Sequence, residues 1–191
     1  MLTWHNILIE LVKFMFPLIE IFRNYSTFGF SGSRSPAGLL PPTILSSAAA
    51  AVPTRSRIVI GCQRGVDAFF RLCFPNAEVF SVDSGKYGEG KGAYAARSIA
   101  CVKAVAADRG LWVSFPASEC PSALIPSAKS SKCFCGSGSG SWSSLAYARG
   151  LGVSCLVYSP FGIPASWDFS PIPTLEGWFS CLEKATQLSL F

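Results

Sequence analysis

Short apolar runs alternate along the chain with longer stretches whose small or apolar residues recur at helical spacing. A short apolar run bounded by turn residues is typical of a buried strand, whereas an amphipathic stretch is typical of a helix. The predicted strands are TFGFSG (27–32), RIVIG (57–61), AEVFSV (77–82), LWVSFP (111–116) and VSCLVYSP (153–160). The predicted helices are PTILSSAAAAV (42–52), GVDAFFRLC (65–73), GAYAARSIACVKAVAAD (92–108) and SWSSLAYARG (141–150). This alternation predicts an α/β fold, a Rossmann-like three-layer sandwich with a mainly parallel sheet, over residues 27–160.

Residues 1–26 form an apolar appendage to this predicted domain. Its charged residues interrupt every apolar run before it reaches the roughly 20 residues of a membrane span, so we expect no stable membrane insertion. Its apolar residues recur at helical spacing and predict an amphipathic helix docked on the domain or on a second subunit, which leaves a homo-oligomer open; they are Ile7, Leu8, Leu11, Phe14 and Met15. Pro17 is expected to bend or end this helix. A membrane contact and a mis-assigned start are the alternatives.

Residues 161–191 differ from the predicted domain in composition. The stretch PFGIPASWDFSPIPTL contains four prolines and predicts a surface wrap. A closing helix is expected after it, with Leu175, Trp178, Phe179 and Leu182 facing inward.

The distribution of charge along the chain suggests an anionic partner. The whole chain carries a formal charge of +5, and residues 28–160 carry 13 lysines and arginines against 6 acidic residues, a balance of +7. Such a basic centre favours a nucleotide, a phosphosugar or nucleic acid, with an ordinary basic surface as the alternative.

The eight cysteines do not predict a disulfide framework or a metal site. Cys133 and Cys135 form a lone C-x-C, and the single histidine, His5, lies far away in sequence, so we expect no metal and no cofactor. The remaining thiols suit a reducing cytoplasm, and five of them have the surroundings of buried small hydrophobes: Cys62, Cys73, Cys101, Cys155 and Cys181.

Glycine-rich loops follow three of the predicted strands. Because the carboxyl ends of parallel strands share one edge, these loops are expected to meet at a single rim, where free N–H groups at helix starts attract anions. None contains a G-K-[ST] ending, and the glycine spacing does not fit G-x-G-x-x-G. The candidate ligand-binding residues are Gly32, Ser33 and Arg34 in the first loop, Gly61, Arg64, Gly65 and Asp67 in the second, and Gly136, Ser137, Gly138, Ser139, Gly140 and Ser141 in the third, with Lys86 and Arg97 nearby.

The third loop, GSGSG, has the composition of a flexible linker as well as that of a ligand loop. A linker separates two domains, whereas here a helix and a strand follow at once and complete the predicted sheet. We therefore predict a ligand loop.

These motifs resemble the SLOG superfamily, which includes the Smf/DprA DNA-processing proteins, the Lonely Guy hydrolases and small nucleotide-binding proteins of bacterial conflict systems. GCQRGVDAFF is similar to its G-x-x-R-G-x-D element, and ADRGLWVSFP to its A-D-x-x-I-A-F-P strand. SVDSGKYGEGKGAYAARS places Tyr87, Gly88 and Arg97 as in one branch, and GSGSGSWSSLAYARGLGVSCLVY resembles the loop, helix and strand that complete the pocket. The resemblance implies a nucleotide-like ligand, with Tyr87 and Arg97 added to the site.

One departure from the family bears on catalysis. Lonely Guy enzymes pair an arginine with a glutamate after the glycine loop; Arg97 lies where that arginine would, but no glutamate follows Gly140. Asp67 and Asp83 are the carboxylates left to substitute, so Arg97 and Asp67 are the catalytic candidates. We expect binding or sensing of a nucleotide-derived or phosphosugar ligand. The alternatives are a nucleoside monophosphate phosphoribohydrolase and a single-stranded DNA binder.

Each of these residues also has a structural interpretation. Asp67 suits the first turn of a helix, and Arg64 and Arg97 suit a solvated surface. Trp142 fits either stacking on a base, as DNA binding requires, or a place in the core.

Overall fold

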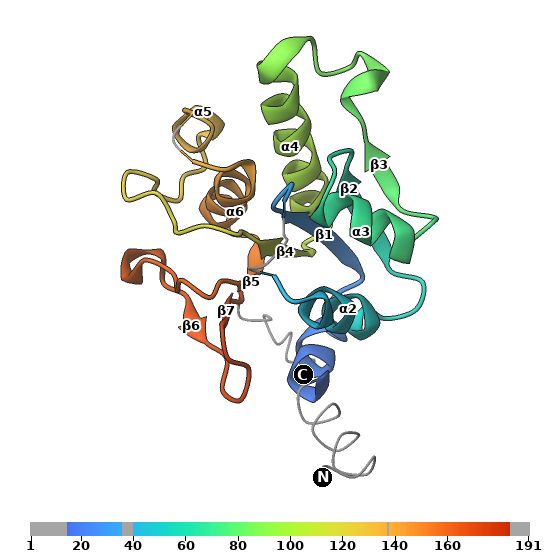
Figure 1. The fold of residues 1–191 in the computed structure, drawn as a ribbon, viewed down its shortest axis with the longest axis vertical. Helices are drawn as coiled ribbons and strands as arrows, with labels where there is room; N and C mark the ends of the chain where they lie inside the picture. Colours follow the sequence, from blue (N-terminus) through green and yellow to red (C-terminus); the bar gives the residue numbers. More distant parts are fainter. Residues whose placement is uncertain (1–14, 36–39, 137, 184–191) are drawn as a thin grey trace, which may run out of the picture.

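In the computed structural model, which describes residues 15–35, 40–136 and 138–183, seven strands form one sheet in the order β3-β2-β1-β4-β5-β7-β6 (Figure 1). The strands β1 to β5 pair in parallel, whereas β7 pairs antiparallel with β5 and β6 antiparallel with β7. Their bounds are β1 (Thr27–Gly32), β2 (Arg57–Gly61), β3 (Glu78–Phe80), β4 (Leu111–Phe115), β5 (Ser154–Tyr158), β6 (Ser170–Pro171) and β7 (Trp178–Cys181).

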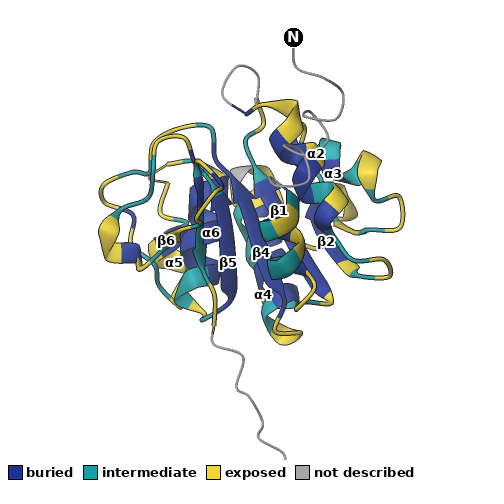
Figure 2. Ribbon diagram, turned by 90° about the horizontal axis from the view of Figure 1, so that it is seen from below, coloured by how far each residue is buried: buried dark blue, intermediate teal, exposed yellow. Residues whose placement is uncertain are grey.

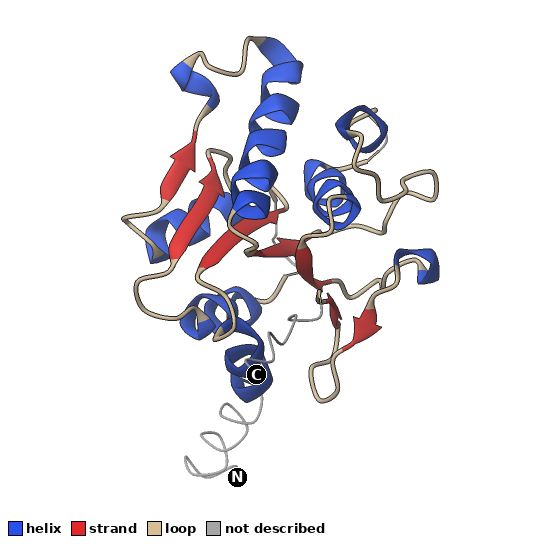
Figure 3. Ribbon diagram, turned by 180° about the vertical axis from the view of Figure 1, so that it is seen from behind, coloured by secondary structure: helices blue, strands red, loops and turns tan. Residues whose placement is uncertain are grey.

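Helices cover both faces of this sheet (Figures 1 and 3). One face carries α2 (Pro42–Ala51), α3 (Val66–Cys73) and a helical stretch at 15–22, and the other carries α4 (Gly90–Ala107), α6 (Gly140–Gly150) and the short α5 (Ser130–Cys133). Two short 3-10 turns complete the elements, η1 (Val82–Ser84) and η2 (Ala165–Trp167). The described part of the chain is thus α/β with a mostly parallel mixed sheet, an arrangement compatible with a Rossmann-like sandwich.

Two apolar cores lie on the two faces of the sheet, and Figure 2 shows the buried strands between their helices. The first is rich in phenylalanine: Phe30 of β1 stacks on Phe70 of α3, with 4.0 Å between ring centroids. The second contains Trp112 of β4, Trp142 of α6 and Trp167 of η2. Sheet strands buried on both faces explain the nearly continuous apolar runs of the sequence.

The stretch 15–22 packs into the first core through Leu18 and Phe22, both fully buried. Phe22 lies 5.1 Å from Phe28 between ring centroids. Pro17 lies inside this helical stretch and does not end it, so of the two expected effects only a bend is left as a prediction. Met15 is half-buried. The other predicted contacts of this helix, Ile7, Leu8, Leu11 and Phe14, lie outside the described residues.

The predicted C-terminal helix is wrong over 178–181, where the chain forms β7. Trp178 and Phe179 are consecutive aromatic residues that serve opposite faces of a strand: Trp178 joins the first core and Phe179 packs against the second. Pairing with β5 also covers a strand edge that otherwise stays bare. The sheet therefore continues beyond the boundary predicted at residue 160.

The predicted buried strand at 77–82 is shorter and more exposed than expected. It spans Glu78–Phe80 at the edge of the sheet, with Glu78 and Val79 exposed. A salt bridge from Arg57 to Glu78, 2.6 Å long, holds this edge strand at its start.

The cysteines are less uniformly buried than predicted. Cys101 and Cys155 are buried, Cys62 and Cys181 are half-buried, and Cys73 is exposed near the end of α3. The prediction is therefore wrong for Cys73, because the last turn of α3 turns this side chain away from the core. None of the helices in the described residues combines the length and apolarity that crossing a bilayer requires.

Candidate ligand-binding site

A cleft of about 920 Å³ opens at the carboxyl edge of the parallel strands. The chain runs from β1 outward to β2 and β3 and then returns to β4 and β5, so the order of the strands reverses between β1 and β4. The loops after these two strands diverge at such a point and leave a crevice. The cleft is lined from the end of β1, the start of α3, one face of α4 and the loop that leads into α6.

Most of the predicted site residues line this cleft. Those brought together are Gly32, Ser33, Arg34, Asp67, Arg97, Gly136, Gly138, Ser139, Gly140 and Ser141. Four predicted residues are not among the cleft-lining residues: Gly61, Arg64, Gly65 and Tyr87. Ser137 lies outside the described residues.

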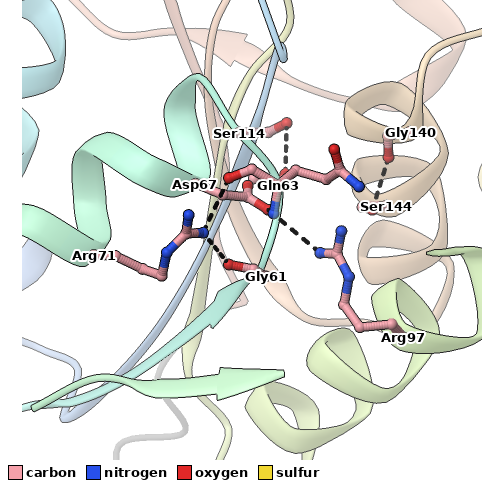
Figure 4. A network of polar contacts seen from close by, with 9 residues as sticks. Gly61, Gln63, Asp67, Arg71, Arg97, Ser114, Gly140 and Ser144 are labelled. Carbon is pink, nitrogen blue, oxygen red and sulfur yellow. Dashed lines mark hydrogen bonds and ion pairs between the residues drawn. The ribbon is translucent and has the colours of Figure 1, made fainter. Parts of the chain in front are cut away.

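A buried ion pair joins two sides of the cleft (Figure 4). Arg97 reaches from α4 to Asp67 in the first turn of α3, with 3.4 Å between Nη1 and Oδ2. Both side chains are more than nine-tenths buried, so the surface interpretation of Arg97 is wrong. The backbone N–H of Gln63 also donates to Asp67, at 3.2 Å.

Burial raises the pKa of the Asp67 carboxyl, and the positive charge of Arg97 together with the Gln63 N–H opposes this rise. The guanidinium is incompletely satisfied: within the described part of the chain its buried Nε has no hydrogen-bond partner. A guanidinium in the wall of a cleft can donate charged hydrogen bonds to a ligand oxygen.

The glycines of the first two loops allow close packing of the protein on itself. A β-carbon on Gly61 would collide with the Arg97 guanidinium, and one on Gly32 with Val66. Gly65 has a φ of 75°, and a β-carbon there would collide with the carbonyl groups of Ser33 and Arg34. These glycines therefore shape the rim of the cleft. Gly32 lines the cleft, whereas Gly61 and Gly65 do not, and their role as ligand contacts stays a prediction.

The start of α6 lines the cleft through Ser139, Gly140 and Ser141, and the first backbone N–H groups of a helix have no acceptor within the helix. The Ser139 hydroxyl caps the helix by accepting from the Trp142 N–H at 3.4 Å, and it lies 2.8 Å from the Ser141 hydroxyl. Ser144 donates back to the Gly140 carbonyl at 2.7 Å. Because α6 has 11 residues, its N-terminus carries a substantial positive partial charge toward this side of the cleft.

Hydroxyl groups also tie the start of α6 to the sheet. Ser31 of β1 donates to Ser114 of β4 at 3.1 Å, and Ser114 donates to the Ser141 carbonyl at 3.4 Å. Ser114 is fully buried. This chain of contacts fixes the first turn of α6 relative to β1 and β4.

The segment between β4 and α6 forms one wall of the cleft. It is anchored to α6 by the Trp142 indole N–H, which donates to the Ser118 carbonyl at 2.9 Å, and by the Ser127 N–H, which donates to the Ala146 carbonyl at 3.4 Å. Phe134 in this segment packs edge-on against Tyr147 and lines the cleft. The middle of α6 is consequently covered, and Ser141 to Ala148 are buried without a break.

Three other candidates lie away from the cleft wall. Trp142 is fully buried and packs edge-on against Trp167, so its place is in the core and it does not present a face to a base. Arg64 and Asp83 are exposed and do not line the cleft. Asp67 is thus the one carboxylate among the described cleft-lining residues.

Sequence reasoning missed much of the floor and the α4 wall. Tyr94 and Cys101 line the cleft beside Arg97, and these residues are spaced as i, i+3 and i+7 on one helical face. That spacing was a signal present in the sequence. Phe30 of β1 and Trp112 of β4 also line the cleft, but their sequence pattern predicts only a buried strand.

The chemistry of the lining is that of hydrogen bonding and charge. Burial raises the pKa of the Cys101 thiol to about 12, so this thiol stays neutral and is a poor nucleophile. In the described residues no group of three or more histidine, cysteine or acidic side chains is placed to hold a metal ion.

Comparison with models of known protein families, with curated proteins and with solved structures finds no match to this chain. The resemblance to the SLOG superfamily therefore stays a prediction from the motifs.

Proposed function

We propose that the cleft binds a nucleotide-derived or phosphosugar ligand and that the protein acts by binding or sensing this ligand. The observation that carries the proposal is that the Arg97 guanidinium is buried in the wall of the cleft. This arginine is 7% exposed, lines the cleft and keeps an unpartnered Nε among the described residues. Burying a guanidinium is unfavourable unless its donors are used; Asp67 accepts from Nη1, and an oxygen-rich ligand in the cleft offers further acceptors to this side chain.

The rest of the lining supports a ligand of this class. Its charged members are Arg34, Arg97 and Asp67, which leaves one net positive charge, and eight serines add hydroxyl donors and acceptors. The start of α6 supplies further N–H donors suited to a phosphate. A volume of about 920 Å³ lies within the range of roughly 300–1,000 Å³ that small-molecule sites occupy.

Binding is favoured over hydrolysis because of how the single lining carboxylate is used. N-glycoside cleavage needs a carboxylate that stabilises positive charge or transfers a proton at the sugar. Asp67 is instead held by Arg97 and by the Gln63 N–H. Single-stranded DNA binding is less favoured, since Trp142, the aromatic residue proposed to stack on a base, is buried.

Ligand addition is expected to raise the melting temperature without consuming the ligand. A panel of AMP, GMP, CMP, UMP and ribose 5-phosphate tests this, because a ligand present at 100 times its Kd stabilises the folded state by about 2.7 kcal/mol. Chromatography of the same samples measures free base. Release of base that disappears in Arg97→Ala contradicts the proposal and favours the hydrolase.

Gly140→Val is expected to weaken binding of the stabilising ligand at least tenfold and to leave the melting temperature of the free protein nearly unchanged. A β-carbon on Gly140 meets no atom within 4 Å, so the fold accepts it, but it lies at the anion-attracting start of α6. Calorimetry on Gly140→Ala and Gly140→Val provides a size series. Gly138 is a poorer test site, because its φ of 105° and its contact with Pro121 make any substitution strain the fold. Unchanged affinity in Gly140→Val would show that residues 136–140 act as a spacer and do not bind the ligand.

A further inference from the structure

Two of the eight cysteines lie opposite each other on neighbouring strands, outside the cleft. Cys155 of β5 and Cys181 of β7 are direct partners in the antiparallel register, and neither forms a disulfide. Among the strand pairs of the described residues, this is the one position that pairs two cysteines. The proposed ligand site leaves both thiols unused.

The two side chains point to the same face of the sheet. Cys155 belongs to the second core, and Phe179, two residues before Cys181, packs against that core. Residues two apart on a strand share a face, so Cys181 lies on the side of Phe179 and Cys155. The two sulfur atoms therefore face each other across the strands on one side of the sheet.

The spacing of the two strands nearly matches that of a disulfide. Ser159 and Gly177 continue the same register, and the Ser159 N–H donates to the Gly177 carbonyl at 2.8 Å, so alternate pairs back to Cys155 and Cys181 are of the hydrogen-bonded kind. The Cα atoms of such a pair lie about 5.5 Å apart, within the range of roughly 4.4–6.8 Å found for disulfides. The Cβ atoms lie about 5 Å apart and need to approach by about 1 Å.

The position of Cys181 on β7 leaves room for this movement. The strand β6 pairs with Phe179 and Ser180 and does not reach Cys181. Cys181 is half-buried, whereas Cys155 is fully buried and its thiol donates to the Val153 carbonyl at 3.1 Å. A thiol is a weak donor, so turning Cys155 away from this carbonyl loses little. A reagent in solution meets Cys181 first.

The end of α6 places a positive charge near both thiols. Burial raises the pKa of Cys155 and of Cys181, and the positive charge of Arg149 opposes this rise at each of them. Arg149 is held there by an ion pair with Asp168, at 3.6 Å, and by the Trp167 carbonyl, which accepts from its Nε at 3.3 Å. Burial thus slows the reaction of these thiols, and the nearby cation favours a thiolate when one forms.

We propose that Cys155 and Cys181 form a reversible disulfide site that is oxidised by a low-molecular-weight disulfide such as glutathione disulfide. The proposal goes beyond the proposed function and does not depend on it. The Cys181 thiolate attacks one sulfur of glutathione disulfide, which forms a mixed disulfide on Cys181 and releases one glutathione thiolate. The Cys155 thiolate then attacks Cys181 Sγ, the second glutathione leaves, and the bond between the two cysteines forms. The released thiolates take up the two protons, so the cysteine pair loses two electrons and two hydrogens to glutathione disulfide.

The disulfide joins β7 covalently to β5 and encloses residues 156–180. This segment contains η2 and β6, and it contributes Trp167 to the second core and Trp178 to the first. A cross-link of this kind stabilises a protein mainly by restricting the unfolded chain. Because the Cβ atoms must be drawn together, the bond is strained and therefore more easily reduced than a structural disulfide.

Mass spectrometry of the full-length protein tests the proposal after incubation with glutathione disulfide, alkylation of the free thiols and digestion with trypsin without reduction. Residues 150–183 contain no lysine or arginine, so the tryptic peptide 150–184 holds Cys155 and Cys181 and no other cysteine. This peptide is expected to be lighter by two hydrogens than its reduced form and to carry no alkyl group. Cleavage after Glu176 should leave its parts joined until dithiothreitol is added. The melting temperature of the oxidised protein should rise by roughly 5–10 °C.

Three variants test the order of the two steps. Cys155→Ser should stop the reaction at the mixed disulfide between Cys181 and glutathione, whereas Cys181→Ser should leave the buried Cys155 reduced. Cys73→Ser is the matched control, because it removes an exposed thiol near the end of α3 and should leave the cross-link unchanged.

The unmodified protein alone is sufficient to contradict the proposal. A cross-link that forms only in urea overturns it, and so does a stable mixed disulfide on Cys181 that Cys155 does not displace. Reduced Cys155 and Cys181 at a glutathione disulfide concentration that already joins other cysteines of the chain overturns it as well. Each readout is independent of ligand binding, so the proposed function is tested separately.

Discussion

Replacing Arg97 by methionine is expected to abolish ligand binding and to lower the free energy of unfolding by about 3–5 kcal/mol at neutral pH. Methionine keeps much of the side-chain length but leaves Asp67 buried without its cationic partner. For a chain of this size the loss corresponds to a fall in melting temperature of roughly 10 °C. Urea unfolding and calorimetric titration measure the two effects separately.

The loss of stability should depend on pH in a definite direction. Burial raises the pKa of Asp67, and Arg97 is the largest opposing influence. A carboxyl whose pKa is higher in the folded state than in the unfolded state contributes stability that is fully present below the unfolded pKa and is lost as pH rises through the folded pKa. The deficit of Arg97→Met relative to the unmodified protein should thus be smallest below about pH 4 and grow toward neutrality.

Two control variants separate the role of Arg97 in the ligand site from its role in the fold. Adding Asp67→Asn to Arg97→Met removes the stranded charge and should recover much of the stability but none of the ligand affinity. Arg57 also forms ion pairs, with Glu78 and Asp108, but its side chain is 40% exposed, so Arg57→Met should lower stability by at most about 1 kcal/mol. Recovery of ligand binding in the double variant contradicts a direct role for Arg97.

The sequence predicted most of the elements between residues 27 and 160, because the longer ones show a clear period there, whereas the edge strand at 78–80 is shorter than predicted and the four-residue helix at 130–133 was missed. A buried parallel strand such as 111–115 needs apolar residues on both faces, and a helix such as 90–107 shows small and apolar residues at a 3.6-residue spacing. It failed at 178–181, where a four-residue strand exists only because β5 offers an edge to pair with. Such tertiary pairing leaves no periodic signal in so short a segment.

The sequence predicted the loop residues of the candidate site but not the tertiary contacts between them. Chain order places the loops at one edge of a parallel sheet, so Ser33, Arg34 and Ser139 were found from sequence. The salt bridge between Arg97 and Asp67 joins two helices 30 residues apart, and nothing in the sequence specifies that these side chains meet. Likewise, LWVSFP predicts a strand, but not that Trp112 lies over Gly29 at the floor of a cleft.

Gly65→Ala is expected to lower the free energy of unfolding by about 3 kcal/mol or more, because two unfavourable effects combine at this position. The backbone of Gly65 has φ 75° and ψ −126°, a conformation that L residues rarely adopt. A β-carbon would also collide with the carbonyl oxygens of Ser33 and Arg34. Unlike a flexible side chain, these carbonyls cannot move alone: the Ser33 carbonyl accepts from the Val66 N–H at 3.0 Å, and the Ser33 N–H donates to the Phe115 carbonyl at 3.0 Å.

Gly85→Ala separates the steric effect from the conformational one. Gly85 has a similar φ of 73°, but a β-carbon there meets no atom within 4 Å, so this substitution should lower stability by only about 1 kcal/mol. The difference between the two urea midpoints measures the energetic cost of the collision between a β-carbon at Gly65 and the carbonyl groups of Ser33 and Arg34. Since that contact positions Ser33 and Arg34 at the rim, Gly65→Ala should also weaken ligand binding, whereas Gly85→Ala should not. Equal effects of the two substitutions on stability and affinity would show that the close approach at Gly65 does not hold the rim in place.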